Sequence, residues 1–91
     1  MTHAVVLVEA ERGALSNLGS ALAEVQGVRE AYSVTGEWDF VAVIHVARHE
    51  DLAAVITGEI ARLPGVERTQ TMVAFEVFSR HDLESMFDIG A

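Results

Sequence analysis

The sequence predicts an α+β domain built from two similar halves, each of which contains a strand, a helix and a second strand. A shift of 38 residues, which places Val28 on Val66, brings residues 26–33 onto residues 64–71. The same shift aligns the apolar positions of a predicted helix in each half: Leu18, Leu22 and Val25 fall on Ile56, Ile60 and Leu63. The resulting order β-α-β-β-α-β is the ferredoxin-like motif, a four-stranded antiparallel sheet with two helices on one face.

Local composition and spacing support each element in turn. Residues 3–10 form an apolar run rich in β-branched side chains, which predicts the first strand. Apolar residues spaced three and four apart predict the first helix: Leu15, Leu18, Leu22 and Val25. Gly27 is placed where that helix ends. The second helix repeats the stripe with Leu52, Ile56, Ile60 and Leu63. The remaining strands are predicted at residues 29–35, 40–47 and 69–79.

One face of the predicted sheet carries no helix, and the sequence makes this face apolar. An open antiparallel face normally alternates polar and apolar residues, whereas residues 3–10 and 40–47 are apolar on both sides. Alternation along the strands places four residues on one face: Val5, Leu7, Val43 and His45. We assign this face to the open side because, with His3, Glu9 and His45, it is the more polar of the two. Since one copy cannot cover both faces, we expect a dimer formed through the open sheet face, with His45 at or near the interface and not under the helices.

Composition limits the classes of function. Fourteen acidic residues and six arginines give a net charge of −8, and the arginines are scattered among acids, so we expect no direct nucleic-acid binding. The absence of cysteine excludes disulfides, thiolate metal sites and a thiol nucleophile. No apolar run approaches the ~18–20 residues that span a bilayer. The start of the chain lacks the features of a signal peptide, which predicts a cytoplasmic protein.

The domain is predicted to occupy residues 1–79, followed by a C-terminal tail at residues 80–91. Leu83, Met86 and Phe87 recur at the spacing of one helical face. The tail is therefore expected to form a short docking helix, and a frayed terminus is the alternative.

Two motifs resemble the effector-binding domain of the Lrp/AsnC family, the leucine-responsive and asparagine-responsive transcriptional regulators. The signature V-x-G-x-aromatic-D-aromatic is matched by Val34, Gly36, Trp38, Asp39 and Phe40. The later elements L-P-G-V and T-x-T are matched by Leu63, Pro64, Gly65, Val66, Thr69 and Thr71. The resemblance covers residues 3–79.

The resemblance implies a dimer of stacked sheets, assembly of dimers into an octamer-like ring, and an amino acid or related metabolite bound between dimers. Full-length members carry a helix-turn-helix domain before this one, and here the first strand begins at His3. We therefore predict a stand-alone sensing and oligomerisation module that is regulatory, is not an enzyme and uses no cofactor. Such a module can also mix with full-length relatives through the same dimer surface.

The predicted ligand-binding residues are Gly36, Trp38, Asp39, Thr69 and Thr71. Gly36 permits close approach of backbone amides, and Trp38 offers an apolar wall with one N–H donor. Asp39 suits an ammonium group, and the threonine hydroxyls suit a carboxylate or amide. Asp39 can alternatively cap its own turn, and Trp38 can alternatively pack at a subunit interface.

Other classes are weighed against this prediction. A small dimeric ferredoxin-like enzyme, of the cofactor-independent monooxygenase or isomerase type, would use His45 as the polar group of an apolar cavity. An ACT-like regulatory domain has the same element order, but its Gly-rich turn is only weakly matched by residues 11–17. His45 and His49 with Glu50 and Asp51 do not predict a metal site, because His45 lies in a strand and His49 at a helix start.

Overall fold

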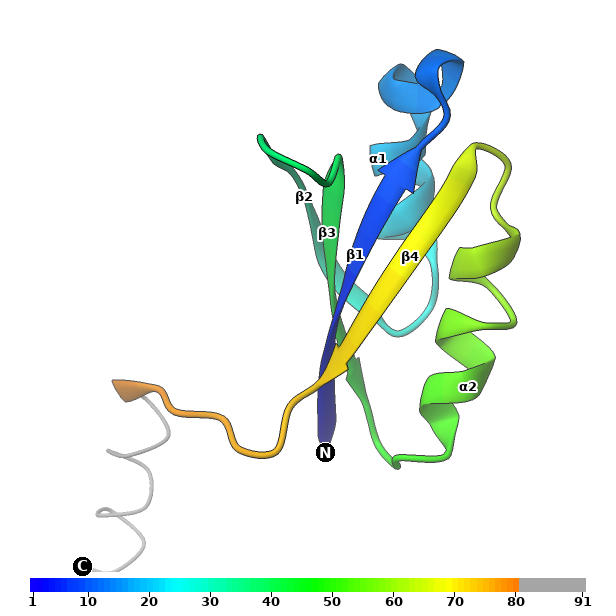
Figure 1. The fold of residues 1–91 in the computed structure, drawn as a ribbon. Coiled ribbons are helices and arrows are strands. Elements are labelled where there is room, and N and C mark those ends of the chain that lie inside the picture. Colours follow the sequence, from blue (N-terminus) through cyan, green and yellow to red (C-terminus); the bar gives the residue numbers. More distant parts are fainter. Residues whose placement is uncertain (81–91) are drawn as a thin grey trace, which may run out of the picture.

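The strands and helices follow the predicted order β-α-β-β-α-β, and the ferredoxin-like α+β fold is confirmed (Figure 1). The computed structural model describes residues 1–80. Its elements are β1 (Thr2–Ala10), α1 (Leu15–Glu24), β2 (Val28–Ser33), β3 (Phe40–Val46), α2 (Asp51–Ile56) and β4 (Val66–Val73). Two short 3-10 helices, η1 (Arg12–Ala14) and η2 (Ile60–Arg62), follow β1 and α2. The strand order is β2-β3-β1-β4, and each neighbouring pair is antiparallel.

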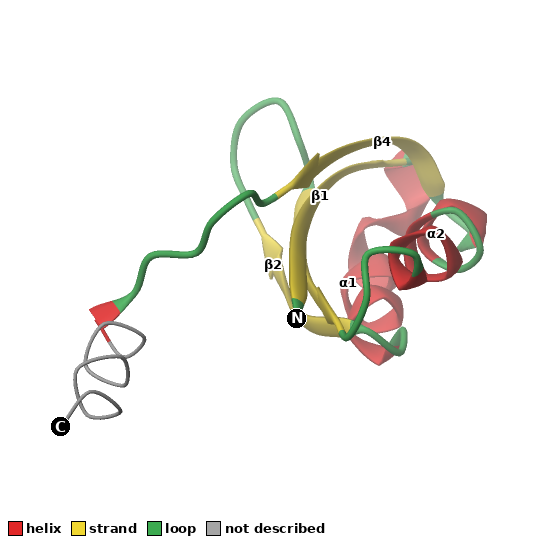
Figure 2. Ribbon diagram, turned by 90° about the horizontal axis from the view of Figure 1, so that it is seen from below, coloured by secondary structure: helices red, strands yellow, loops and turns green. Residues whose placement is uncertain are grey.

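Both helices cover the same face of the sheet (Figure 2). Buried and half-buried residues alternate along β1 and β3, and the buried ones form the strand side of the core: Ala4, Val6, Val8, Ala10, Phe40, Ala42, Ile44 and Val46. The helical side of the core consists of Leu18, Leu22, Leu52, Val55 and Ile60. Full burial of one such aliphatic side chain contributes about 1.5–3 kcal/mol, so this layer is the main source of the domain's stability.

The other face of the sheet is not covered by the described residues, and we call it the open face. Its ends are polar, with His3 paired with His45 at one end and Glu9 paired with Arg68 at the other. Its centre is apolar and consists of half-buried or exposed residues: Val5, Leu7, Tyr32, Val41, Val43 and Met72. His45 alternates with the buried residues of β3, so its predicted position away from the helices is confirmed. Its place in a dimer interface stays a prediction.

The second helix is shorter than predicted. The apolar stripe indicated one helix from Leu52 to Leu63, whereas α2 ends at Ile56 and η2 begins at Ile60. The amides of Thr57 and Gly58 both donate to the carbonyl of Ala53, and this shared acceptor ends the regular helical ladder. Gly58 favours the break because glycine is a poor helix former. Neither helix of residues 1–80 is long and apolar enough to cross a membrane.

The last strand begins and ends earlier than predicted. We expected residues 69–79, and β4 spans Val66–Val73. Its partner β1 begins at Thr2, so pairing stops after the amide of Ala74 donates to the carbonyl of His3 at 2.9 Å. Beyond this point Phe75 and Phe78 are exposed. The predicted docking helix with Leu83, Met86 and Phe87 lies outside the described residues.

Candidate functional site

The hairpin turn between β2 and β3 carries three of the five predicted ligand-binding residues. The amide of Val34 donates to the carbonyl of Asp39 at 3.0 Å, which closes the loop. Gly36 has a φ of +106°, a conformation that favours glycine. A Cβ at Gly36 would meet no atom within 4 Å. The tip of the turn is therefore open to solvent and accessible to a ligand.

Asp39 attaches this turn to the neighbouring strand β1. Its backbone amide donates to the carbonyl of Val8 at 2.9 Å. Its side-chain Oδ2 accepts a hydrogen bond from the amide of Ala10 at 2.8 Å. The pairing of β1 with β4 shifts register between Glu9 and Ala10, so the carboxylate satisfies an amide at an irregular part of the sheet. This hydrogen bond joins Asp39 to a different strand, so it is not a cap of its own turn. The other carboxylate oxygen, Oδ1, can still accept a hydrogen bond from a ligand.

We predict that Asp39→Ala destabilises the domain by about 1–3 kcal/mol, because it leaves the partly buried amide of Ala10 without its acceptor. Asp39→Asn keeps an acceptor oxygen, so its free energy of unfolding should fall clearly less. Urea denaturation of both variants measures the difference in the free energy of unfolding. Glu37→Ala, in the same turn but exposed, is the control. Equal stability of Asp39→Ala and wild type would show that the bond to Ala10 contributes nothing.

Arg68 on β4 meets Trp38 of the turn. The Arg68 guanidinium lies over the indole ring, 4.3 Å from its centroid, within the range of a cation–π interaction. Arg68 Nη2 also lies 3.4 Å from Glu9 Oε2 and 3.7 Å from Glu37 Oε1. We call this group of four residues the Arg68 cluster. It connects the turn, β1 and β4 at one end of the sheet.

Thr69 and Thr71 lie on the opposite side of the sheet from this cluster. Residues directly paired across antiparallel strands share a face. Thr69 pairs with Val8 and Thr71 with Val6, whose side chains are buried under the helices, whereas Arg68 pairs with half-buried Glu9. The structure therefore brings Gly36, Trp38 and Asp39 together in one turn and separates them from the two threonines of the same chain.

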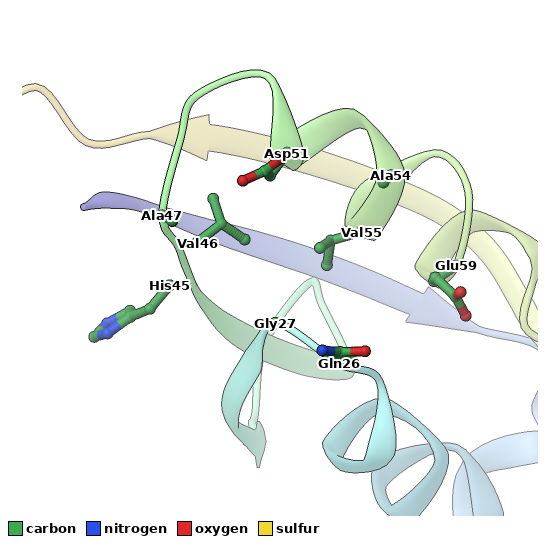
Figure 3. Close-up of a pocket in the computed structure, with 9 residues that line it drawn as sticks. All are labelled: Gln26, Gly27, His45, Val46, Ala47, Asp51, Ala54, Val55 and Glu59. Atoms are coloured by element: carbon green, nitrogen blue, oxygen red, sulfur yellow. The ribbon is translucent and has the colours of Figure 1, made fainter.

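Three of the surface hollows formed by residues 1–80 lie away from this turn. The first, of about 490 Å³, lies between the α1–β2 connection, the end of β3 and α2 (Figure 3). Its lining consists of Gln26, Gly27, His45, Val46, Ala47, Asp51, Ala54, Val55 and Glu59. The second, of about 440 Å³, lies beside η1 and α1. The third, of about 370 Å³, lies beside α2. Thr71 lines this third hollow, and none of the other predicted ligand-binding residues lines any of the three.

The first hollow does not have the features expected of an enclosed enzyme site. The residues that line it include no aromatic side chain apart from the imidazole of His45, and Figure 3 shows the His45 ring directed away from its centre. Asp51 already accepts hydrogen bonds from the backbone and side chain of Arg48. Among residues 1–80 no polar or charged side chain is fully buried. The specific observation that would favour the enzyme alternative is therefore not found in the described part of the chain.

His45 belongs instead to a small basic group at the far end of the open face. It pairs with His3 across β1 and β3, and the two ring centroids lie 3.9 Å apart. Arg29 Nη1 lies 3.3 Å from His45 Nδ1. Desolvation, followed by the nearby His3 and Arg29, lowers the pKa of His45 below its ordinary value. Since arginine can only donate, this contact requires an unprotonated Nδ1, in agreement with the lowered pKa.

The fold and its exposed polar turn define a small ligand-binding domain, and comparison with known proteins gives its family. A model described as the Lrp/AsnC ligand binding domain matches residues 3–83, and the chain belongs to this family. The transcriptional regulator FL11 of Pyrococcus horikoshii is 34% identical over 73 residues, which are 80% of this chain and 48% of that protein. FL11 of Pyrococcus abyssi is 30% identical over 73 residues, with the same shares of 80% and 48%. The chain thus spans about half the length of these curated relatives.

Solved structures of similar size agree with this assignment. TTHA0845 from Thermus thermophilus superposes with a TM-score of 0.82 at 42% identity, over 88% of this chain and 100% of that one. FFRP-DM1 superposes with a TM-score of 0.77 at 31% identity, over 82% of this chain and 100% of that one. The family predicted from the two sequence motifs is confirmed, and both FL11 relatives are named as HTH-type transcriptional regulators.

Sequence reasoning missed Arg68 as a residue of the candidate site. In the sequence Arg68 is one of six arginines scattered among acids, a pattern that does not suit a phosphate backbone. The available signal was its position: Arg68 directly precedes the T-x-T element and the predicted strand at residues 69–79, and in the structure it lies within β4, paired with Glu9.

Proposed function

We propose that this chain is the amino-acid-sensing and assembly module of a transcriptional regulatory system. The observation that carries the proposal is the apolar centre of the open face, which has residues from all four strands. Soluble monomers rarely expose contiguous apolar patches beyond a few hundred Å². A second copy stacked on this face would remove it from water, and family membership supports that mode of assembly.

The proposed effector is an amino acid or a related small metabolite. Two proteins that share the fold at TM-scores of 0.76 and 0.73 were solved with L-methionine: the regulator NMB0573 of Neisseria meningitidis and a feast or famine regulatory protein of M. tuberculosis. Their identities to this chain are 14% and 22%, and they support an amino acid as the class of ligand that this fold can bind.

The separation of the predicted site residues favours a site between copies. Gly36, Trp38 and Asp39 lie in the turn, whereas Thr69 and Thr71 lie on the other face of the sheet in the same chain. A cleft between neighbouring dimers would join the turn of one copy to the threonines of another. The module would then couple ligand binding to assembly, including an octamer-like ring, and through mixed assembly to full-length relatives.

Native mass spectrometry of the purified chain, with and without each of the twenty common amino acids, tests this proposal. We expect a dimer or a multiple of it without ligand. With the effector we expect a changed distribution of assemblies and the added mass of an amino acid. A monomer under all conditions would contradict the assembly role, and the absence of any bound amino acid would contradict the sensing role.

An electrophoretic shift assay at low salt should show no complex with DNA for this chain alone.

A further inference from the structure

We propose that Arg68 binds the carboxylate of the amino-acid effector and that the site selects ligands with a free carboxylate. This inference rests on the amino-acid-sensing function proposed above. The inference adds Arg68 to the predicted site residues. In this assignment the Arg68 guanidinium, and not the threonine hydroxyls, binds the carboxylate.

The geometry of Arg68 leaves its guanidinium able to accept a new partner. Charge-assisted bonds between arginine and a carboxylate are typically about 2.7–2.9 Å long. The contacts of Arg68 with Glu9 and Glu37 measure 3.4 Å and 3.7 Å, so both ion pairs are loose. Both also use Nη2, while a guanidinium has five N–H donors. Since the Arg68 side chain is 51% exposed, a ligand carboxylate can approach the remaining donors directly.

Trp38 supports the guanidinium of Arg68 from one side. The 4.3 Å distance from Arg68 Cζ to the ring centroid places the cation over one face of the indole. Because the indole covers one side of the guanidinium, a ligand carboxylate must approach the N–H donors that Trp38 leaves accessible, and the planar fork of arginine matches the two oxygens of a carboxylate. Trp38 therefore acts as a positioning residue for Arg68, in addition to being an apolar wall.

The charges around Arg68 complement a zwitterion. Glu9 and Glu37 lie beside it, and Asp39 follows Trp38 in the same turn. Three carboxylates alone would repel an amino acid's carboxylate, so the turn without Arg68 suits amines. With Arg68 present, one cation lies close to several anions. The cation can pair with the carboxylate of a free α-amino acid, and an anion can pair with its ammonium group. Burying either group without a partner is costly.

Thr69 and Thr71 are poorly placed to replace Arg68 within one chain. Their side chains lie on the helix side of β4, and Thr71 lines the hollow beside α2. Arg68 and its partner Glu9 lie on the other side of the sheet. A ligand that contacts the turn thus meets Arg68 first, and a threonine hydroxyl can reach it only from a neighbouring copy.

Isothermal titration calorimetry with an acid and its amide tests the assignment. The probes are L-methionine and L-methioninamide, or the corresponding pair for the amino acid that binds most tightly in the panel above. Wild type should prefer the acid over the amide. Arg68→Gln should bind the acid roughly tenfold to a hundredfold more weakly, because hydrogen bonds to a charged group are lost, and should bind the amide with unchanged affinity. Arg68→Lys should give an intermediate loss, since it keeps the charge without the fork.

Arg62→Gln, which removes an exposed arginine on η2 outside the site, is the matched control and should bind both probes like wild type. Thr69→Val tests the competing assignment of the carboxylate to a threonine, because it removes a hydroxyl and preserves the shape of the side chain. It should keep the preference of wild type for the acid. If Arg68→Gln is folded by circular dichroism and still prefers the acid as strongly as wild type, the assignment of Arg68 is wrong. Loss of that preference in Thr69→Val alone also overturns it. If wild type binds no amino acid, the proposed sensing function fails, and this inference fails with it.

Discussion

A Val43→Asp chain is expected to be monomeric at concentrations where the wild-type chain is fully dimeric. Val43 lies in the middle of the open face, half-buried and directly paired with Val5 on β1 and Glu30 on β2. Val5 in turn pairs with Met72 on β4. Val43 therefore lies within a row that crosses the whole sheet, at the centre of the face through which we propose that two copies stack.

The expected effect is large because a symmetric dimer contains each substitution twice. Taking a carboxylate out of water without a partner costs several kcal/mol even after relaxation, and 1.4 kcal/mol is tenfold in an equilibrium constant. Two such groups should raise the dimer dissociation constant by at least roughly a thousandfold. Sedimentation velocity of wild type and variant measures the change directly. In the monomer the introduced carboxylate faces water, so the fold should remain intact by circular dichroism.

Ala23→Asp controls for the added charge. Ala23 is exposed on α1, on the side of the molecule that carries the helices, and the substitution makes the same change in net charge. This variant should sediment like wild type. A Val43→Asp chain that remains dimeric would place the interface elsewhere on the molecule. A monomeric wild type would contradict assembly through any surface of this chain.

The features predicted correctly from the sequence are those that depend on local periodicity. A period of two along residues 3–10 and 40–47 placed Val6 and Ile44 in the core and Val43 and His45 on the open face. The predicted end of the second helix was wrong, because the apolar periodicity continues past the point where the helix ends. Ile60 is still buried, although the helix is interrupted at Gly58. An apolar stripe shows which residues face the core and does not show whether the backbone between them is continuous.

The features that the sequence did not predict depend on the register between strands. Arg68 and Glu9 are 59 positions apart and become neighbours only through the pairing of β1 with β4. The bond from Ala10 to Asp39 likewise requires the irregular pairing after Glu9. The end of β4 follows from the start of β1 rather than from its own composition, since β-branched and aromatic residues continue past Val73. These contacts are long-range, and no local pattern encodes them.

Gly65→Ala is expected to destabilise the domain by about 2–5 kcal/mol, more than the same substitution at Gly36 or Gly13. Gly65 has a φ of +97°, and an L-residue forced into a left-handed conformation costs about 1–2 kcal/mol. A Cβ at this position would also collide with the Cβ of Ala14 in η1, and overpacking costs typically about 1–3 kcal/mol. The collision cannot be relieved easily, because the Gly65 carbonyl accepts a hydrogen bond from the Glu11 amide at 2.8 Å, which fixes the two segments together.

Two other glycines separate these causes. Gly36 has a φ of +106° and open space around its Cβ position, whereas Gly13 has neither a positive φ nor a neighbour within 4 Å. Gly36→Ala should therefore cost about 1–2 kcal/mol, and Gly13→Ala should stay within about 0.5 kcal/mol of wild type. Since 1 kcal/mol shifts the Tm of a domain of this size by roughly 4–8 °C, thermal denaturation resolves the three variants. Equal losses at Gly36 and Gly65 would show that η1 moves away from the added methyl group without cost, and that the glycine of the L-P-G-V element is required for its backbone conformation alone.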